Sequence, residues 1–266
     1  GSIIKSYLKQ RKSIGISEKT LKNSHLYLGR FQKYLDHNDI NNFSKLSKED
    51  IFGFIKSLSY STKSTVHCTL STLRGFLRYL HQEGILDADW SYLLPKDNYR
   101  KQAKLPTTYT KEKINSILQA VDRGNPKGKR DYAIILLAAR LGLRASDICN
   151  LKFINLLWQQ NLIVLNQKKT KKQVELPLIT EVGNAIIDYL KYGRPESNLP
   201  YIFLHANHGH RKLKEPILHS IVYFYMKVAG IKNIDHKKHG PHALRHSLAG
   251  LLLEKKTPLP VISEVL

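Results

Sequence analysis

The sequence predicts a mainly α-helical protein with a small antiparallel β-sheet, divided into two domains. Apolar residues recur at helical spacing along most of the 266 residues. Two short apolar runs in the second half, joined by a lysine-rich turn, instead have the pattern of a β-hairpin. A basic stretch bounded by Pro95 and Pro106 interrupts the helical pattern. We therefore expect a helical bundle in residues 1–100, a basic linker in 101–108 and a mixed α+β domain in 109–266.

The first domain is predicted to be a bundle of four or five helices. Ser47, followed three residues later by Asp50, is typical of a capping box at a helix start. Gly84 stands where a helix C-cap belongs. Four segments have the apolar spacing of amphipathic helices: 3–11, 18–35, 47–58 and 62–82.

The second domain is predicted to combine helices with short strands. Thr110 is typical of a helix N-cap, and Asp147 is expected to begin a short helix. Residues 124–129 are predicted to form a loop. Three segments have strand patterns, the first two forming the hairpin: 161–166, 173–178 and 201–204. Longer helices are expected at 110–121, 131–141, 180–190, 216–228 and 241–253.

The charge balance favours a nucleic-acid partner. Lys and Arg number 43 against 21 Asp and Glu, a formal net charge of +22 that is spread along the whole chain. Self-repulsion of that size is relieved when a polyanion neutralises it, and nucleic acid is the common polyanion. An anionic membrane is the competing partner. We expect no membrane association, because there is no basic amphipathic segment with an aromatic-rich apolar face and no apolar run approaching about 18 residues.

The cysteines favour a reducing compartment. Cys68 and Cys149 both lie in helical patterns with apolar neighbours, so we expect buried free thiols and a cytoplasmic protein. No signal peptide is visible. The initial Gly1-Ser2 resembles an expression scar, which implies that the natural N-terminus, with any preceding domain, lies upstream.

Histidines are frequent near the end of the chain and raise the question of a metal site. His205, His208 and His210 are close in sequence, as are His236 and His239. No cysteine or cluster of carboxylates accompanies them, and no zinc-finger or zincin spacing is present. We therefore expect no metal and no cofactor.

A stretch near the end predicts an anion-binding helix start. Pro241 suits the first turn of a helix, and His242 and Arg245 lie three apart, on one face. Both side chains can point at one anion, helped by the positive end of the helix dipole. The alternative is an ordinary solvated helix face.

Two further features carry cations. Arg144 follows an apolar helix at the Gly142 turn, where the core can hold it facing a cleft, and Asp147 could orient it. The alternative there is a capped helix start with a surface arginine. The lysine-rich hairpin tip is placed to reach a DNA groove, although a solvated turn would have the same pattern.

Taken together, these motifs resemble the tyrosine recombinases, the phage-integrase family. The order is Leu-Gly-Leu-Arg-x-Ser-Asp at 141–147, then a Lys-Thr hairpin ending in Leu-Pro-Leu at 176–178, then His-x-Leu-Arg-His at 242–246. Residues 105–110 are similar to the family's start of the catalytic domain, and the helical first half resembles its core-binding (SAM-like) domain. The resemblance covers nearly the whole chain.

The resemblance implies a role for each site residue. Arg144 would be the first phosphate-binding arginine, supported by Asp147, and His242 and Arg245 would complete the pocket, with His246 beside them. Lys169 would be the general acid toward the leaving 5′ oxygen, chosen because its distance to Pro177 matches the family pattern. Lys168 and Lys171 remain open for that role. Further DNA contacts are expected at Lys63, Ser64, Thr65, Arg74, Lys101, Lys104, Lys168 and Lys171.

The resemblance also implies the reaction and the partners. A tyrosine attacks a phosphodiester and forms a covalent 3′-phosphotyrosine, without metal or ATP. The two domains would clamp a double-stranded recombination site, four protomers would assemble on it, and the protein would be cytoplasmic and nucleoid-associated. The family's nucleophile would follow Leu266, because Tyr223 and Tyr225 precede His242 and are expected in the core or at DNA. We therefore expect residues 1–266 to bind DNA without cleaving it.

Two alternatives remain open. One is a non-catalytic sequence-specific DNA-binding or architectural protein, which would lack a tyrosine shortly after Leu266. The other is a metal-dependent nuclease, which would need carboxylate ligands that we do not find in the sequence and would lose activity in EDTA.

Overall fold

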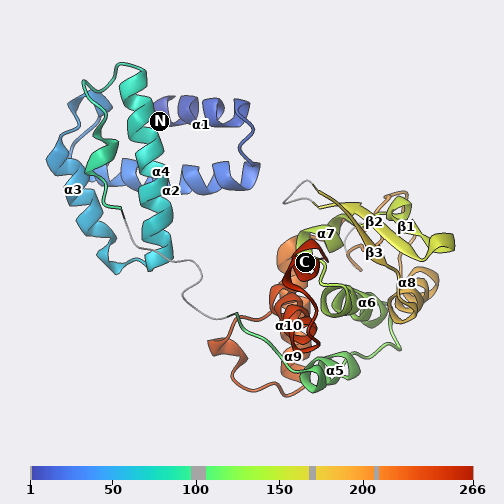
Figure 1. The fold of residues 1–266 in the computed structure, drawn as a ribbon. Coiled ribbons are helices and arrows are strands. Elements are labelled where there is room, and N and C mark those ends of the chain that lie inside the picture. Colours follow the sequence, from blue (N-terminus) through green and yellow to red (C-terminus); the bar gives the residue numbers. More distant parts are fainter. Residues whose placement is uncertain (1, 97–105, 168–171, 207–209, 266) are drawn as a thin grey trace. The chain divides into compact units, whose positions relative to one another are not determined.

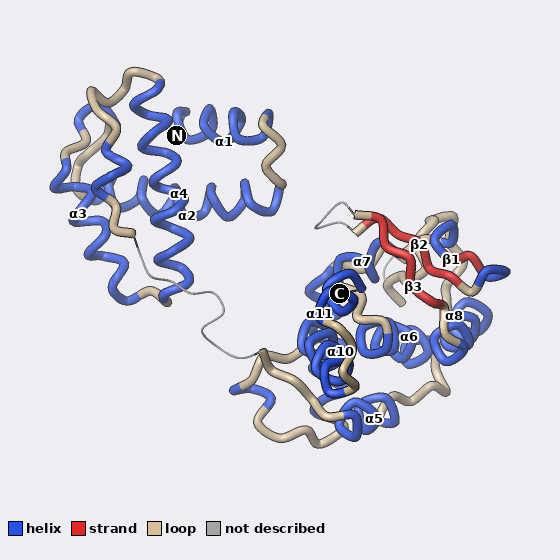
Figure 2. Tube along the Cα trace, in the orientation of Figure 1, coloured by secondary structure: helices blue, strands red, loops and turns tan. Residues whose placement is uncertain are grey.

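The chain forms two compact units. A computed structural model describes residues 2–96, 106–167, 172–206 and 210–265. Contacts between Cα atoms divide the chain into unit 1, Gly1–Lys104, and unit 2, Leu105–Leu266 (Figure 1). Both are mainly helical, and the strands lie at one edge of unit 2 (Figure 2). The predicted fold class, mainly α with a small antiparallel sheet, is confirmed.

Unit 1 is a bundle of α-helices with side-chain caps. Ser17 and Thr62 cap the second and fourth helices, and Ser47 and Asp50 form the predicted capping box. Just after the fourth helix, Gly84 has φ +69°, the left-handed conformation that glycine adopts at low cost. The helices are α1 (Ser2–Ser13), α2 (Glu18–His37), α3 (Lys48–Ser57) and α4 (Lys63–Gln82).

The core of unit 1 is aromatic and apolar. Phe31 of α2 packs against Phe54 of α3, with ring centroids 4.9 Å apart, and Phe76 of α4 packs against Tyr7 of α1 at 5.3 Å. These rings join all four helices through one buried cluster. Their burial provides the main stabilisation of the bundle, since apolar area removed from water is the largest favourable term in folding.

Unit 2 surrounds one central helix with others and adds a three-stranded sheet. The middle of the central helix, α6, is fully buried, with Ile134, Ile135, Leu136 and Leu137 all at 0% exposure. The helices of unit 2 are α5 (Lys111–Gln119), α6 (Pro126–Arg140), α7 (Ala145–Asn150), α8 (Thr180–Tyr192), α9 (Glu215–Val228), α10 (Pro241–Glu254) and α11 (Leu259–Val265). The strands are β1 (Leu156–Leu157), β2 (Leu162–Asn166) and β3 (Gln173–Pro177).

The sheet is antiparallel in the order β1-β2-β3, with Ile163 of β2 opposite Leu176 of β3. Both of these side chains are buried in the core of unit 2, so the apolar face of the hairpin sets its register. The predicted hairpin is confirmed within a residue of each boundary. The two-residue strand β1 was not foreseen, because its length is too short to show a pattern.

Two sequence predictions are wrong in detail. The predicted loop 124–129 ends early, because Asn125 caps α6 and Pro126 occupies its first turn. Residues 201–204 make only single bridges, Tyr201 to Lys152 and Leu204 to Lys212, so they are no strand. Arg194 instead binds the carbonyl oxygens of residues 201 and 202.

Two further predictions concern the burial of the cysteines and the absence of a membrane-spanning segment. Cys149 is buried as predicted, whereas Cys68 is only half-buried, and neither cysteine forms a disulfide. Across the described part of the chain, no helix combines the length and apolarity that crossing a membrane requires.

A candidate phosphate-binding site

The turn between α6 and α7 positions Arg144. Leu141 and Leu143 are both buried and anchor the chain on either side of Gly142. Gly142 has φ +62°, so the chain can reverse here at low conformational cost. Arg144 is then the N-cap residue of α7. The backbone of Arg144 is therefore fixed by the core while its side chain reaches the surface of unit 2.

The Arg144 guanidinium lies between a carboxylate and an amide. Its side chain is 20% exposed, and Nη1 lies 4.0 Å from Oδ2 of Asp147, whose side chain is 1% exposed. Nη1 also donates a hydrogen bond to Oε1 of Gln167. An ion pair with Asp147 and a hydrogen bond to Gln167 thus orient one end of the guanidinium.

Gln167 was missed by the sequence analysis. It is buried, and its backbone N–H donates to the carbonyl of Lys172 at 2.9 Å, across the base of the β2–β3 hairpin. The hairpin is therefore joined directly to Arg144. A polar residue at the end of an apolar strand was the available signal, but the neighbouring lysines drew the interpretation to the hairpin tip.

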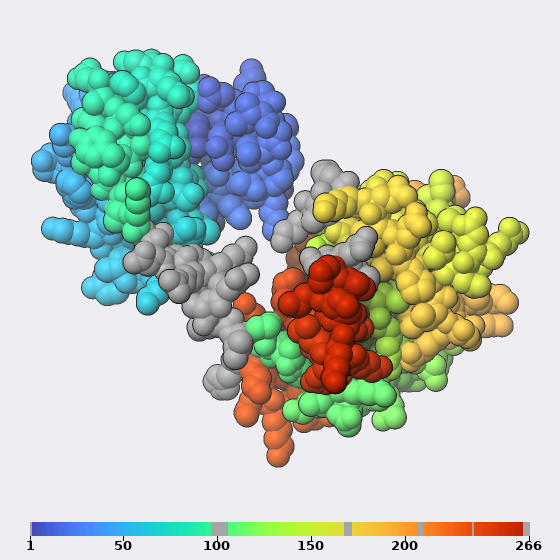
Figure 3. All heavy atoms as spheres, in the orientation of Figure 1, coloured from blue at the N-terminus to red at the C-terminus, as the bar shows by residue number. Residues whose placement is uncertain are grey.

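Helix α10 delivers a second arginine to the same place. Arg245 is 6% exposed, and its Nη1 donates a hydrogen bond to the carbonyl oxygen of Gly142, in the turn that precedes Arg144. Figures 1 and 3 show α10 and the C-terminal residues at the surface of unit 2. Burial, and then the nearby charge of Arg144, lower the pKa of Arg245 to about 10, while Asp147 acts in the opposite direction. The pair of guanidinium groups therefore shares one carboxylate.

The second Arg245 terminal nitrogen points to an anion site. Nη2 is buried and has no hydrogen-bond acceptor in the part of the chain that the structure describes. A buried charged donor without an acceptor is costly, and a phosphate oxygen would satisfy it with a charge-assisted bond. The arrangement is therefore suited to holding an anion against Arg144 and Arg245.

Two histidines flank this position on α10. His242 is exposed in the first turn, and its ring lies 4.5 Å from that of His246, centroid to centroid. Burial, followed by the charges of Arg245 and Lys238, lowers the pKa of His246 below its usual value. His246 is therefore mostly neutral at pH 7 and can accept or donate a hydrogen bond there.

Gly240 makes the start of α10 possible. It has φ +93°, and a Cβ added to it would lie 2.4 Å from Nδ1 of His219 on α9. We expect Gly240→Ala to lower the free energy of unfolding by about 2–4 kcal/mol, from backbone strain plus the clash. Chemical denaturation measures this. Gly230→Ala is the matched control, because Gly230 has φ +69° but nothing within 4 Å of the added Cβ, so equal losses would contradict the clash.

The remaining predicted site residues lie elsewhere. Lys63, Ser64 and Thr65 form the first turn of α4 in unit 1. Arg74, also on α4, donates from Nη2 to the carbonyl oxygen of Pro95 at 3.1 Å. The other predicted lysines fall outside the described residues: Lys101, Lys104, Lys168, Lys169 and Lys171.

Arg74 also lines a polar cavity of about 440 Å³ in unit 1. The cavity lies between α1, α2 and α4, and Arg11 and Arg78 give it two more cations. Tyr27 and Cys68 also line it. Unit 1 therefore has a basic cavity that one of the predicted DNA contacts, Arg74, lines.

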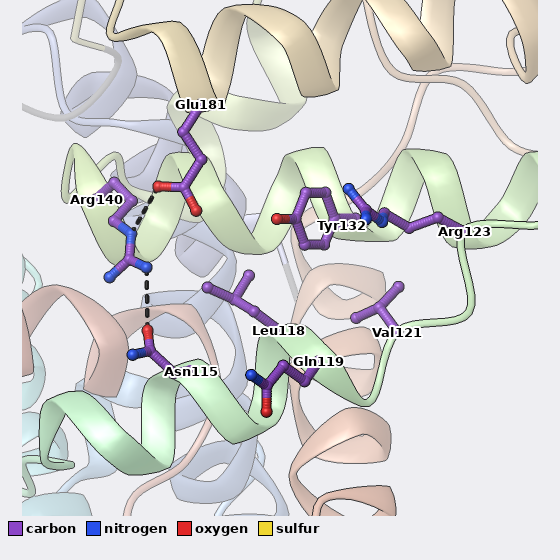
Figure 4. Close-up of a pocket in the computed structure, with 8 residues that line it drawn as sticks. All are labelled: Asn115, Leu118, Gln119, Val121, Arg123, Tyr132, Arg140 and Glu181. Carbon is purple, nitrogen blue, oxygen red and sulfur yellow. Dashed lines mark hydrogen bonds and ion pairs between the residues drawn. The ribbon is translucent and has the colours of Figure 1, made fainter.

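A cavity of about 400 Å³ in unit 2 is separate from the arginine pair (Figure 4). The residues that line it come from α5, α6, α8 and the segment between α5 and α6, and none of them is a predicted site residue. Arg140 crosses one end, pairing with Glu181 at 3.0 Å and donating to Asn115. The predicted chemistry does not use this cavity.

The other predicted candidates do not gather at the arginine pair. Tyr225 is buried, with its hydroxyl 3.5 Å from Oδ2 of Asp131, and Tyr223 donates to Asp235 at 2.6 Å. Among the residues that the structure describes, no three histidine, cysteine or carboxylate side chains cluster as metal ligands would. His208 falls outside that part of the chain.

Comparison with known proteins identifies two family regions. Residues 107–266 match the model of the phage integrase family, and residues 4–84 match the model of its N-terminal SAM-like domain. The chain is 32% identical over 225 residues to y4rA of Sinorhizobium fredii, an inferred integrase/recombinase, covering 84% of this chain and 54% of y4rA. The chain thus spans about half the length of that relative.

Other relatives cover more of both chains. The tyrosine recombinase XerD of Listeria innocua is 28% identical over 258 residues, covering 95% of this chain and 84% of XerD. Among solved structures, a lambda integrase (75-356) dimer bound to a COC' core site has a TM-score of 0.73 and 18% identity, covering 99% of this chain and 89% of that one. This structural likeness shows the same fold.

Proposed function

Because the chain belongs to the phage integrase family of tyrosine recombinases, we propose that the Arg144–Arg245 pair binds the phosphodiester that a site-specific recombinase cleaves. The observation that carries the proposal is Nη2 of Arg245, a buried charged donor without an acceptor among the described residues, beside a second guanidinium. The substrate is double-stranded DNA.

Each arginine has a defined part in this proposal. The Arg144 and Arg245 guanidinium groups donate to the two non-bridging oxygens and neutralise the negative charge that these oxygens carry in the transition state. Asp147 and Gln167 orient Arg144 before the substrate arrives. A bound phosphate would also stabilise the charged form of Arg245, whose pKa burial lowers.

The imidazoles and the hairpin supply proton-transfer groups. His242 and His246 lie at the start of α10 next to Arg245 and donate hydrogen bonds to the reacting phosphate. Lys169, at the tip of the hairpin whose base residue Gln167 contacts Arg144, protonates the leaving 5′ oxygen. Lys168 and Lys171 are the other hairpin candidates for this role.

The nucleophile is proposed to be a tyrosine hydroxyl. Its oxygen bonds to phosphorus, the bond to the 5′ oxygen breaks, and a 3′-phosphotyrosine links protein and DNA. The link keeps the bond energy for rejoining, so neither metal nor ATP is needed. Tyr225 is the last tyrosine of the 266 residues and is buried, with its hydroxyl 3.5 Å from Oδ2 of Asp131. We therefore infer that a polypeptide of residues 1–266 binds DNA without cleaving it.

Both units are proposed to contact the duplex. In unit 1 the contacts come from Lys63, Ser64, Thr65 and the basic cavity near Arg74. The linker and hairpin lysines add phosphate contacts: Lys101, Lys104, Lys168 and Lys171. Four protomers would assemble on paired sites for strand exchange, and the protein would reside with the nucleoid in the cytoplasm.

Salt should weaken DNA binding steeply if phosphates dominate the interface. For residues 1–266 with a duplex, we expect the association constant to fall about 10³-fold or more between 50 and 200 mM salt, as for roughly 6–10 phosphate contacts. Fluorescence anisotropy at several salt concentrations measures the slope. A log–log plot that is flat would contradict a phosphate interface.

A covalent adduct tests the reaction itself. Selection from random duplexes with residues 1–266 first identifies the preferred DNA site. The natural protein that contains these residues is then incubated with a duplex of that site. The duplex carries a nick, so that the short cleaved end diffuses away and the adduct accumulates. We expect a protein–DNA adduct at a 3′ phosphate, in EDTA, and none with residues 1–266 alone. Specific binding without an adduct would favour a non-catalytic DNA-binding protein, and an adduct-free cleavage that EDTA stops would favour a metal-dependent nuclease.

A further inference from the structure

The segment by which the chain enters unit 2, residues 107–109, lies along α10. The backbone N–H of Tyr109 donates to Oγ of Ser247 at 2.7 Å, across 138 residues of sequence. Tyr109 and Ser247 are both buried, at 6% and 1% exposure. A hydrogen bond closed off from water in this way has little solvent competition.

The same segment also holds the loop that leads into α10. Lys238 donates its backbone N–H to Oγ1 of Thr107 at 3.3 Å, and the Tyr109 hydroxyl donates to the carbonyl oxygen of Lys238 at 3.3 Å. The segment is therefore attached before the helix begins, at Lys238, and within its second turn, at Ser247. His242 and Arg245 lie between these two attachments.

Ser247 uses its hydroxyl for both helix and segment. Oγ donates to the carbonyl oxygen of Ala243 at 2.8 Å, one turn earlier, while it accepts from Tyr109. A hydroxyl is one donor and two acceptors, so both bonds can form at once. Ser247 thus links the turn of α10 that carries Arg245 to residues 107–109.

We propose that Ser247 is a positioning residue of the phosphate pocket, fixing the α10 turn that bears His242 and Arg245 against residues 107–109. The inference rests on the proposed function of that pocket. Other contacts also hold this turn: Arg245 binds the Gly142 carbonyl and His219 lies against Gly240. Ala243 and Leu244 are buried in the core of unit 2. Without the Tyr109 bond, the turn loses its direct attachment to residues 107–109 within the helix, and its position relative to Arg144 is less closely fixed.

A shift of this kind should affect the reaction more than DNA binding. Misplacing a reacting group by about 1 Å can cost about 100-fold in rate. We expect Ser247→Ala to slow adduct formation by the natural protein by about 10- to 100-fold, and to change the dissociation constant for DNA less than about threefold. Ser247→Thr keeps the hydroxyl and should restore most of the rate.

Ser116→Ala is the matched control. Ser116 on α5 makes the same bond to the carbonyl four residues earlier, at 3.0 Å, without reaching residues 107–109. Hydrogen exchange of the peptide that contains Tyr109 gives an independent readout on residues 1–266. The Tyr109 amide should exchange about tenfold faster in Ser247→Ala than in the wild type or in Ser116→Ala.

The outcomes separate this inference from the proposed function. If the wild-type natural protein forms no adduct, the proposed function fails. If it forms the adduct and Ser247→Ala forms it as fast, or if Ser247→Thr is as slow as Ser247→Ala, Ser247 does not position the pocket. A rate loss matched by an equal loss of DNA affinity would also overturn the inference, because it indicates general destabilisation of unit 2.

Discussion

Replacing Arg144 with alanine in the natural protein is expected to slow DNA strand cleavage by about 100- to 1000-fold, the usual cost of removing a donor aimed at developing negative charge. The change also leaves Asp147 beside Arg245 without its partner guanidinium, so the pocket loses both charge and orientation. DNA affinity should change less than about fivefold, because one phosphate contact among many is removed. Adduct formation and anisotropy measure the two effects.

Arg140→Ala is the matched control for this prediction. The Arg140 side chain is 24% exposed, close to the 20% of Arg144, and it lies one turn earlier in the chain. It pairs with Glu181 at the cavity of Figure 4 instead of entering the arginine pair. Its loss should leave cleavage within about twofold, as expected for a surface ion pair. Unimpaired cleavage by Arg144→Ala would remove Arg144 from the site.

Replacing Asp131 with alanine is expected to be the most destabilising single change, costing about 3–5 kcal/mol of unfolding free energy. Arg130 is 5% exposed and binds Asp131 at 2.8 Å and the Leu204 carbonyl oxygen at 3.1 Å. Removing the carboxylate leaves the guanidinium buried without its counter-ion, at the base of the helix whose far end leads to Arg144. Loss of the Asp131 carboxylate therefore destabilises α6, the helix that leads to Arg144.

Denaturation that reports on unit 2 alone measures this loss. Trp158 lies in unit 2 and Trp90 in unit 1, and these are the two tryptophans of the chain, so fluorescence in a Trp90→Phe background follows unit 2. Asp188→Ala is the control, because its ion pair with Lys129 is partly exposed, at 35% and 18%, and should be worth about 1 kcal/mol or less. Equal losses from the two substitutions would contradict the role of burial.

Local signals made most of the fold predictable from the sequence. The caps at Ser47 and Thr110 and the apolar spacing of the helices act within about a turn of the residues that carry them, and the structure confirms both. The hairpin was predictable for the same reason. The start of α6 was not, because Gly124, Asn125 and Gly128 suggest a loop while Asn125 and Pro126 in fact cap and open the helix.

The site was predictable only in part, since its contacts join distant segments. The sequence indicates that His242 and Arg245 share a helix face, but the structure exposes the histidine and buries the arginine. The bond from Arg245 to the Gly142 carbonyl spans 103 residues, and nothing in the spacing reports it. Gln167 and Ser247 were missed because amide and hydroxyl groups have no distinctive spacing.

The central claim is that Arg144 and Arg245 neutralise the scissile phosphate. Cleavage of DNA with a charge-neutral analogue of this phosphodiester tests it most directly. A methylphosphonate at the scissile position removes the negative charge that Arg144 and Arg245 are proposed to neutralise. On ordinary DNA, Arg245→Ala should form adduct at least about 100-fold more slowly than the wild-type natural protein. On methylphosphonate DNA, the ratio of the wild-type rate to the Arg245→Ala rate should fall to less than about tenfold, because the negative charge of the substrate phosphate is gone. An equally large difference on both substrates would contradict a phosphate-neutralising role for the arginine pair.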